Sequence, residues 1–150
     1  WKDIMRMVAP DGPMYQAGTL SGNPLGMAAG LATLQYLADH PETYDDLERR
    51  CAELQKKVDA HIGEKGYPVT TNRVGSMFTV FFTDQKVESW EQSSQSDTEA
   101  FGRFFQEMLA REVHLPPAQF EAWFMSIAVS DEMFEDLATK VCESLDAALT

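Results

Sequence analysis

The run YQAGTLSGNPLGMAAG, from Tyr15 to Gly30, joins a loop of small polar residues directly to an apolar, alanine-rich segment. Thr19 and Ser21 offer hydroxyl donors, and Gly18 and Gly22 have no Cβ to keep an anion away from the main chain. A loop that enters a helix N-terminus can leave backbone N–H groups free, and the helix dipole adds roughly half a positive charge there. The run therefore predicts a site that could hold a phosphate group.

The same run also has a purely structural interpretation. It matches neither GxxxxGK[ST] nor a GxGxxG that follows a strand, and the loop contains no lysine. Small residues at a helix start often serve only as caps, and either Asn23 or Ser21 could cap a helix that begins at Pro24. The residues alone leave phosphate binding and plain capping both open.

The elements around this loop are expected to be helical. A short helical turn is predicted over Ile4–Val8, and a helix from Pro24 to about Ala38. A further helix should run from Pro41 to about Gly63, because apolar residues recur at spacings of three and four, and Gly66 is a plausible stop signal. The helix after Pro24 is expected to place five residues inside: Leu25, Ala28, Leu31, Ala32 and Leu34.

Strand patterns follow this helical part of the chain. Val69–Thr71 and Met77–Thr83 are rich in β-forming residues, and Gly75 between them should allow a tight bend. The apolar run in the second segment is typical of a strand covered on both faces. The polar residues Asp84–Gln95 predict an irregular exposed loop, in which Trp90 could be a contact residue.

Two more helices and a short strand are expected towards the end of the chain. Ser96 and Glu99 form a capping-box pattern before an apolar stripe that continues to Leu109. The run MSIAV (125–129) is a strand candidate, and Ser130 can cap the last helix. The second half of the chain thus predicts a small α+β unit, a sheet with helices on one face, while the first half resembles helices from a larger body.

Composition excludes several classes of partner. The net charge is −12 and the pI about 4.5, which argues against a nucleic-acid binder and against a polybasic membrane patch. No apolar run approaches the length of a membrane span, and no secretory signal is found. Cys51 and Cys142 lie on apolar helix stripes, so both are expected to be reduced, buried thiols, and no Cys/His spacing suggests a metal site. A cytoplasmic protein is expected.

Four segments together resemble one enzyme family. They are MVAPDGPMYQAGTLSGNPLGMAAGLATL, NRVGSMFTVFFT, SDTEAFGRFFQEML and VHLPPAQFEAWFMSIA. Their order and spacing are similar to those of the glutamate-1-semialdehyde aminomutases, class III aminotransferases that use pyridoxal 5'-phosphate (PLP). The resemblance implies a fold-type I α/β architecture: the end of the large PLP domain (1–40), a connecting helix (41–66), and a small α+β domain (67–150) with an antiparallel sheet. The abrupt apolar start WKDIMRMVAP fits a piece of a longer protein.

The resemblance also assigns roles to individual residues. It implies that Thr19, with the backbone N–H of Gly18, binds the phosphate of the cofactor held by a neighbouring subunit, and hence a homodimer. Tyr15 would line the substrate pocket or belong to the interface core. Glu121, in QFEAWF, would contribute to the substrate pocket, with a solvated loop glutamate as the alternative. Arg73 could anchor a carboxylate, although a structural role is favoured.

A complete enzyme of this family needs a lysine that binds the cofactor covalently, and the resemblance places that lysine upstream of this chain. None of the six lysines lies in the family's lysine motif. The three histidines (His40, His61 and His114) are expected at the surface or at helix ends, without a catalytic partner. This chain therefore contains no expected catalytic residue, and alone it is expected to be inactive.

The complete protein would convert glutamate 1-semialdehyde to 5-aminolevulinate for tetrapyrrole synthesis, with the cofactor in its pyridoxal and pyridoxamine forms. The bacterial cytoplasm is the expected location, and a plastid is possible. Two other interpretations stay open at this point. One is a class III aminotransferase that acts between two different molecules, and the other is a non-catalytic interaction module. The apolar opening, the Ala/Gly-rich helix and the three tryptophans imply faces that need a partner, so the isolated piece is expected to self-associate.

Overall fold

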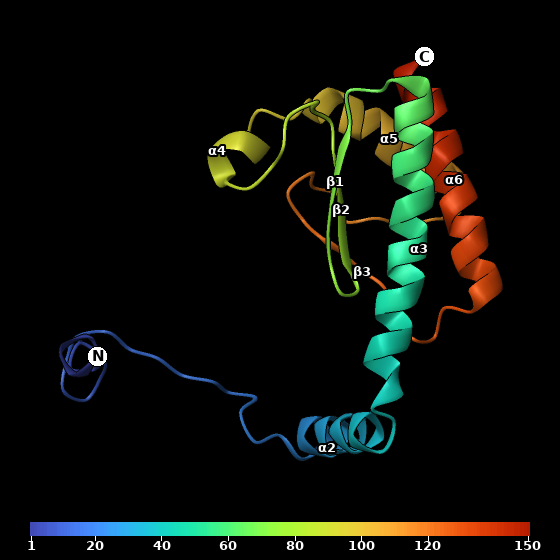
Figure 1. Cartoon of the computed structure of the whole chain (residues 1–150). Coiled ribbons are helices and arrows are strands. Elements are labelled where there is room, and N and C mark those ends of the chain that lie inside the picture. The colour runs from blue at the N-terminus through green and yellow to red at the C-terminus, as the bar shows by residue number, and fades with distance from the viewer. The chain divides into compact units, whose positions relative to one another are not determined.

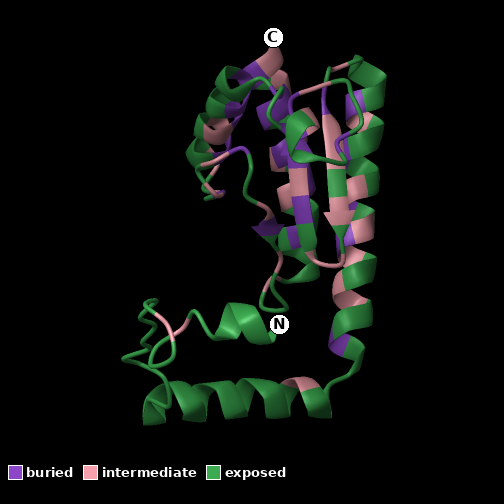
Figure 2. Ribbon diagram, turned by 90° about the vertical axis from the view of Figure 1, so that its left-hand side faces the viewer, coloured by how far each residue is buried: buried purple, intermediate pink, exposed green.

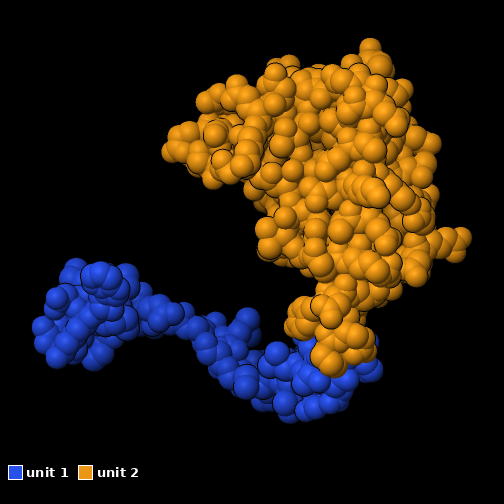
Figure 3. Space-filling model, in the orientation of Figure 1, with its two compact units in different colours: residues 1–40 blue, residues 41–150 orange.

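A computed structural model describes all residues, 1–150, and the chain forms two compact units. Unit 1 comprises Trp1–His40 and unit 2 comprises Pro41–Thr150; they are coloured separately in Figure 3. No helix in the chain combines the length and the apolar character that crossing a bilayer requires.

Unit 1 consists of two helices joined by a long loop. The helix α1 (Lys2–Met5) begins two residues earlier than the turn predicted over Ile4–Val8, and α2 spans Pro24–Asp39. The start of α2 is explained by Asn23, whose side-chain oxygen accepts hydrogen bonds from the backbone N–H groups of Leu25 and Gly26. Of the two predicted caps, Asn23 is therefore the correct one.

The apolar residues of α2 are not buried in this chain. Leu25 is 79% exposed, Leu31 69% and Leu34 68%, and Figure 2 shows α2 almost entirely in the colour of exposed residues. The prediction that these leucines lie inside, together with Ala28 and Ala32, is wrong for the chain as it stands. The physical reason is that no element of the chain covers them.

Unit 2 begins with the long helix α3 (Glu42–Lys65), which ends where Gly66 adopts a left-handed conformation with φ 68°. The Gly66 stop signal is thereby confirmed, since glycine takes this conformation at little steric cost. The helix buries one stripe of residues at spacings of three and four: Cys51, Leu54, Val58 and Ile62. Its neighbour is α6 (Asp131–Leu149), which begins at the predicted cap Ser130, and the two helices lie side by side in Figure 1.

The sheet of unit 2 has three antiparallel strands in the order β1-β2-β3. The strands β1 (Thr70–Val74) and β2 (Met77–Phe81) form a hairpin whose tight turn contains Gly75 with φ 57°, as predicted. Phe78 and Val80 point into the core, but Met77 is 40% exposed, so β2 is not covered completely on both faces. The strand also ends at Phe81, two residues before the predicted end.

The third strand corrects a prediction. The strand β3 is Trp123–Phe124, not residues 125–129. Ser126 turns the chain there, because its carbonyl accepts from the Val129 N–H (3.1 Å) and its hydroxyl accepts from the Ala128 N–H (3.2 Å). Trp123 is the residue of this region that packs in the core, and its side chain is 4% exposed.

The segment between β2 and the next long helix is more ordered than predicted. It contains the short helix α4 (Trp90–Ser93), and Val87 and Ser93 within it are buried. A capping box is indeed present, but it joins Ser89 and Gln92 at the start of α4. The predicted box of Ser96 and Glu99 is wrong, because Asp97 caps α5 (Thr98–Ala110) by accepting from Glu99 N and Ala100 N.

One hydrophobic core holds unit 2 together. The helices α3, α5 and α6 supply most of it, and β2, β3 and the loop residues Val69, Phe82 and Leu115 supply the remainder, so that the helices pack on one face of the sheet as expected. Aromatic rings form its centre: Trp123 lies parallel to Phe104 (6.1 Å) and edge-on to Phe78 (5.2 Å). Both cysteines are free; Cys51 is buried, whereas Cys142 is only half-buried.

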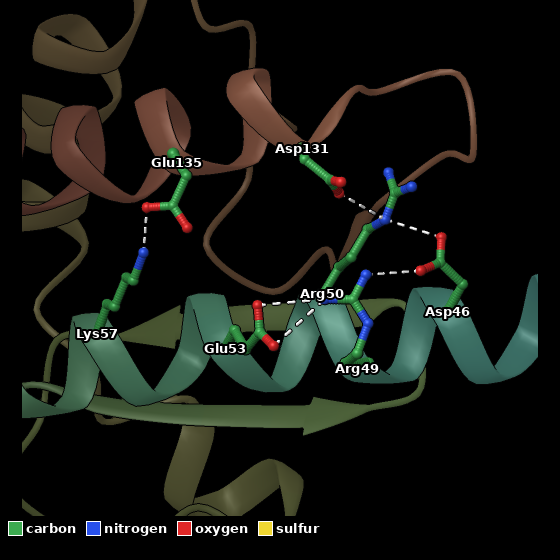
Figure 4. A network of polar contacts seen from close by, with 7 residues as sticks. All are labelled: Asp46, Arg49, Arg50, Glu53, Lys57, Asp131 and Glu135. Atoms are coloured by element: carbon green, nitrogen blue, oxygen red, sulfur yellow. Dashed lines mark hydrogen bonds and ion pairs between the residues drawn. The ribbon is translucent and has the colours of Figure 1, made fainter.

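Polar contacts link α3 and α6 outside this core (Figure 4). The Nε of Arg50 lies 3.1 Å from Asp131. Arg50 also donates to the Val129 carbonyl (2.7 Å), and its guanidinium lies over the ring of Phe134. Lys57 pairs with Glu135 further along the two helices. These contacts fix the start of α6 and the segment that leads from β3 into it.

Candidate functional site

The loop before α2 is folded by its own backbone. The Gly18 carbonyl accepts from Ser21 N (3.0 Å), and the Leu20 carbonyl accepts from Asn23 N (3.1 Å). Gly22 has φ 73°, a conformation that favours glycine. A Cβ at position 18 would lie 2.3 Å from the Ser21 hydroxyl oxygen, so a larger residue there would require the Ser21 side chain to turn away.

Thr19 is exposed and is the first central residue of the turn that the Gly18 carbonyl and Ser21 N close. Its hydroxyl makes no hydrogen bond within the chain, and neither do the backbone N–H groups of Gly18, Thr19 and Leu20. Several donors without an acceptor, on consecutive residues, suit an anion with several oxygens. The loop can therefore do the chemistry that its sequence suggests, which is to hold a phosphate group.

The helix terminus contributes less than expected. Pro24 has no N–H, and the N–H groups of Leu25 and Gly26 are already bound to the Asn23 side chain. The expectation that free N–H groups of the helix start would bind the anion is therefore corrected. The free donors belong to the loop, and α2 can add only its dipole.

Tyr15 belongs to the same loop, four residues before Thr19. Its side chain is 83% exposed, and no hydrogen bond involves its hydroxyl. The structure thus brings three candidate residues, Tyr15, Gly18 and Thr19, onto one loop of unit 1.

Glu121 lies in unit 2, in the segment that leads into β3. Its backbone N–H donates to the Ala118 carbonyl (3.1 Å), which closes a turn, and its carboxylate is exposed without an ion-pair partner. It lines a mainly apolar pocket together with His114, Trp123 and Phe124. A carboxylate beside apolar walls is suited to binding a cationic group of a small molecule.

Arg73 is not available to bind a substrate carboxylate. Its Nη1 donates to Glu48 Oε2 and its Nη2 donates to Glu48 Oε1, each at 2.7 Å, and its Nε donates to Gln55 (3.0 Å). The hydrogen bonds from Arg73 are the main reason that the pKa of Glu48 lies below its ordinary value. The favoured structural role of Arg73 is therefore the correct one.

Of the histidines, His114 lines the same pocket as Glu121, whereas His61 lies on α3 and contacts a residue of α6. His61 Nε2 lies 2.8 Å from Asp146, which also accepts from the Tyr67 hydroxyl at 2.8 Å. The Tyr67 hydrogen bond, followed by that of His61, lowers the pKa of Asp146. This half-buried contact between α3 and α6 was missed by the sequence analysis, since its members are 85 residues apart. No group of His, Cys, Asp and Glu side chains is arranged to hold a metal ion.

One further residue near the site was not singled out from the sequence. Gln119, in the QFEAWF motif, is 3% exposed and donates from Nε2 to the Val80 carbonyl at 2.8 Å. The only hint in the sequence is a long polar side chain beside Leu115 and Phe120 in a proline-containing segment.

Comparisons with known proteins give a consistent result. The glutamate-1-semialdehyde 2,1-aminomutase of a Thermus thermophilus strain is 50% identical over 148 residues, which is 99% of this chain and 34% of that protein. The corresponding protein of Aquifex aeolicus is 44% identical over 96% of this chain and 34% of its own length. This chain thus spans about a third of the curated relatives that it matches, at their carboxy-terminal end. No family model matches the chain.

Solved structures share the fold. An omega-transaminase from Sphaerobacter thermophilus has a TM-score of 0.79 at 24% identity, over 99% of this chain and 34% of that one. A transaminase solved with PLP bound has a TM-score of 0.74 at 19% identity, over the same shares of the two chains. The predicted fold class is therefore confirmed: a mixed helical unit with a small antiparallel sheet, as in the carboxy-terminal part of these transaminases.

Proposed function

The chain belongs to the glutamate-1-semialdehyde 2,1-aminomutase family, and we propose that it forms the carboxy-terminal third of an enzyme that converts glutamate 1-semialdehyde to 5-aminolevulinate. The observation that carries this proposal is sequence identity of about half over almost the whole chain. The reaction moves an amino group within one molecule, so the complete enzyme would be an isomerase of the aminotransferase class. We place it in tetrapyrrole synthesis in the cytoplasm of a bacterium.

Within that enzyme, each part of the chain has a proposed place. Residues 1–40 would complete the large PLP-binding domain, 41–66 would connect the domains, and 67–150 would form the small domain. The division of the chain into units between His40 and Pro41 supports the first boundary. The connecting segment contains α3, which packs into the core of unit 2. This packing supports counting the connecting helix as part of the small domain.

The loop of unit 1 fits the phosphate end of the cofactor. The Thr19 hydroxyl and the N–H groups of Gly18 and Thr19 are free of partners within the chain, and neither residue is buried. These groups would hold the phosphate of PLP, or of its pyridoxamine form, in the site of a neighbouring subunit, which requires a homodimer. When bound, the cofactor supplies the electron sink that the amino transfer needs.

Two residues would serve the substrate. Tyr15 would line the pocket from the same loop as Thr19, and Glu121 would hold a cationic group of the substrate from the small domain. The exposed, unpaired carboxylate of Glu121 beside an apolar pocket supports this role. Both side chains would bind and orient, and neither is proposed to break a bond.

The lysine that binds the cofactor covalently is proposed to lie outside this chain. Four of its six lysines pair with nearby carboxylates, which ties them to structural roles; these pairs are Lys57–Glu135, Lys65–Asp146, Lys86–Glu88 and Lys140–Asp136. We therefore expect residues 1–150 alone to bind no substrate productively and to produce no 5-aminolevulinate.

A chimeric enzyme tests the proposed function. In it, residues 1–150 replace the matching third of the Thermus thermophilus aminomutase. We expect it to bind PLP and to form 5-aminolevulinate from glutamate 1-semialdehyde. If the folded, PLP-loaded chimera instead exchanges amino groups only between a separate amine donor and a keto acid, the chain belongs with the intermolecular transaminases. If it does neither, a non-catalytic role is favoured.

A further inference from the structure

A tight turn holds Glu121 in place. The Glu121 N–H donates to the Ala118 carbonyl at 3.1 Å, with Gln119 and Phe120 at the two central positions of the turn. Pro116 and Pro117 precede it, and their rings fix two backbone φ angles. The main chain that carries Glu121 is therefore restricted before any side chain is considered.

The turn replaces a continuation of the sheet. The register of β2 and β3 pairs Met77 with Phe124 and Phe78 with Trp123. Two more pairs in the same register would put Glu121 opposite Val80, inside the ladder. The ladder ends first, and the Val80 carbonyl accepts instead from Gln119 Nε2 at 2.8 Å. A side-chain amide thus takes the position of a main-chain donor and lets Glu121 leave the sheet.

Gln119 depends on this single polar contact. Its side chain is buried, and its Oε1 has no hydrogen-bond partner. Only the NH₂ end of the amide can donate to a carbonyl, so the orientation of the amide is set by Val80. Replacing the amide with an apolar group would release the turn from β2 at this point.

Phe120 gives the turn a second contact. Its ring meets that of Trp90 edge-on, with centroids 5.0 Å apart. The two central residues of the turn therefore contact different elements, one reaching β2 and the other α4. Glu121, directly after them, is exposed and lines the pocket.

We propose that Gln119 is a positioning residue for Glu121: by completing the hydrogen bond of Val80, it holds the turn that presents the Glu121 carboxylate to the substrate. This inference rests on the proposed function, in which Glu121 binds a cationic group of glutamate 1-semialdehyde. Gln119 itself is not expected to touch the substrate.

The test is a double-mutant cycle in the chimeric enzyme, with glutamate 1-semialdehyde as substrate. Glu121→Gln should raise KM about tenfold with little change in kcat, since a charged hydrogen bond to the bound substrate is lost. Gln119→Met, which keeps the length and apolar volume of the side chain, should raise KM in the same direction. The double variant should be no worse than Glu121→Gln alone. Gln106→Met, at an exposed glutamine of α5, is the matched control and should leave KM unchanged.

Several results would overturn the inference. One is an unchanged KM in Gln119→Met, and another is a KM rise that multiplies with that of Glu121→Gln, because a general structural defect would act independently of Glu121. An active parent whose KM is unaffected by Glu121→Gln would overturn the inference and the substrate role of Glu121, and would leave the proposed reaction standing.

A second measurement on the 150-residue chain does not depend on catalysis. Gln119→Met should speed amide hydrogen exchange at Glu121 by about tenfold or more, while exchange at the buried Val141 of α6 stays as in the parent. If the parent chimera makes no 5-aminolevulinate, the proposed function fails, and unchanged exchange at Glu121 would then overturn the positioning role as well.

Discussion

Glu48 and Arg73 form a bidentate ion pair between α3 and β1, in which each terminal nitrogen of the guanidinium lies 2.7 Å from one carboxylate oxygen. Arg73 also donates to the Gly75 carbonyl at the hairpin turn (2.9 Å). The arginine therefore connects a helix, a strand and a turn, and its side chain is only 14% exposed. A planar fork of donors can do this, and a lysine could not.

The ion pair predicts a pH dependence of stability. The folded-state pKa of Glu48 is lowered from 4.5, mainly by the hydrogen bonds from Arg73. The contribution of the pair to the free energy of unfolding is therefore fully present above about pH 4.5 and is lost as the pH falls through the lowered folded-state pKa. Glu48→Gln should lower the urea midpoint near neutral pH, and its difference from the parent should shrink in acid. Urea titrations followed by Trp fluorescence measure both.

Asp84→Asn is the control, because the Asp84 carboxylate is exposed in a loop, lies at no helix terminus and makes no ion pair. Its urea midpoint should follow that of the parent at every pH. A difference between Glu48→Gln and the parent that stays constant down to strong acid would contradict the proposed role of the carboxylate charge.

Local signals in the sequence predicted the helices well. Asn23, Gly66 and Ser130 each act through backbone groups a few residues away, so their caps can be recognised without tertiary information. The prediction of a strand at residues 125–129 was wrong, because an alternation of apolar residues does not show which side chain will be buried in the core. The buried side chain is that of Trp123, and its packing against Phe104 cannot be predicted from the sequence.

Only the part of the candidate site that lies within one loop could be predicted from the sequence. Gly18, Thr19 and Asn23 stand within one loop, and the free donors of that loop follow from its small residues. The role of Gln119 could not be read in the same way, because its partner Val80 is 39 residues away. The expectation that N–H groups at the start of α2 bind the anion was wrong for a reason that the sequence contains. Pro24 has no N–H, and Asn23 binds the N–H groups of the next two residues.

Thr19→Val is expected to weaken PLP binding by the chimeric enzyme. The substitution removes the hydroxyl donor and keeps the branched shape of the side chain. Loss of one hydrogen bond to a charged phosphate corresponds to about 1.5–3 kcal/mol, or roughly tenfold or more in the dissociation constant. Titration of the apoenzyme with PLP, followed by its absorbance, measures the change.

Thr19→Ser keeps the hydroxyl and should bind PLP nearly as tightly as the parent. Equal affinity of the parent and Thr19→Val would refute the phosphate role of this side chain. Since Val keeps both branches of the side chain and Ser lacks the methyl group, a loss confined to Thr19→Ser would assign the effect to the methyl group and not to the hydroxyl.

Glu112→Gly should stabilise unit 2. Glu112 follows α5 with φ 64°, and the Val113 N–H donates to the Met108 carbonyl (2.9 Å), which is the geometry of a Schellman ending. A residue with a Cβ loses about 1 kcal/mol in this conformation relative to glycine, so the urea midpoint should rise accordingly. Gln106→Gly, in the exposed middle of the same helix, should lower stability by about the same amount. A fall in stability for Glu112→Gly would contradict this explanation.

The exposed surface of α2 predicts self-association of the 150-residue chain. The helix has a single charged residue, Asp39, and helices that are apolar on every side are normally buried. Leu31→Glu with Leu34→Glu should lower the sedimentation coefficient at high protein concentration and reduce binding of a hydrophobic dye, because both leucines are exposed and apolar. Met133→Glu changes an exposed apolar residue of unit 2 instead and should leave the association unchanged. A parent chain that sediments as a compact monomer and binds no dye would show that α2 is covered in solution, and would remove the basis for expecting a partner on this helix.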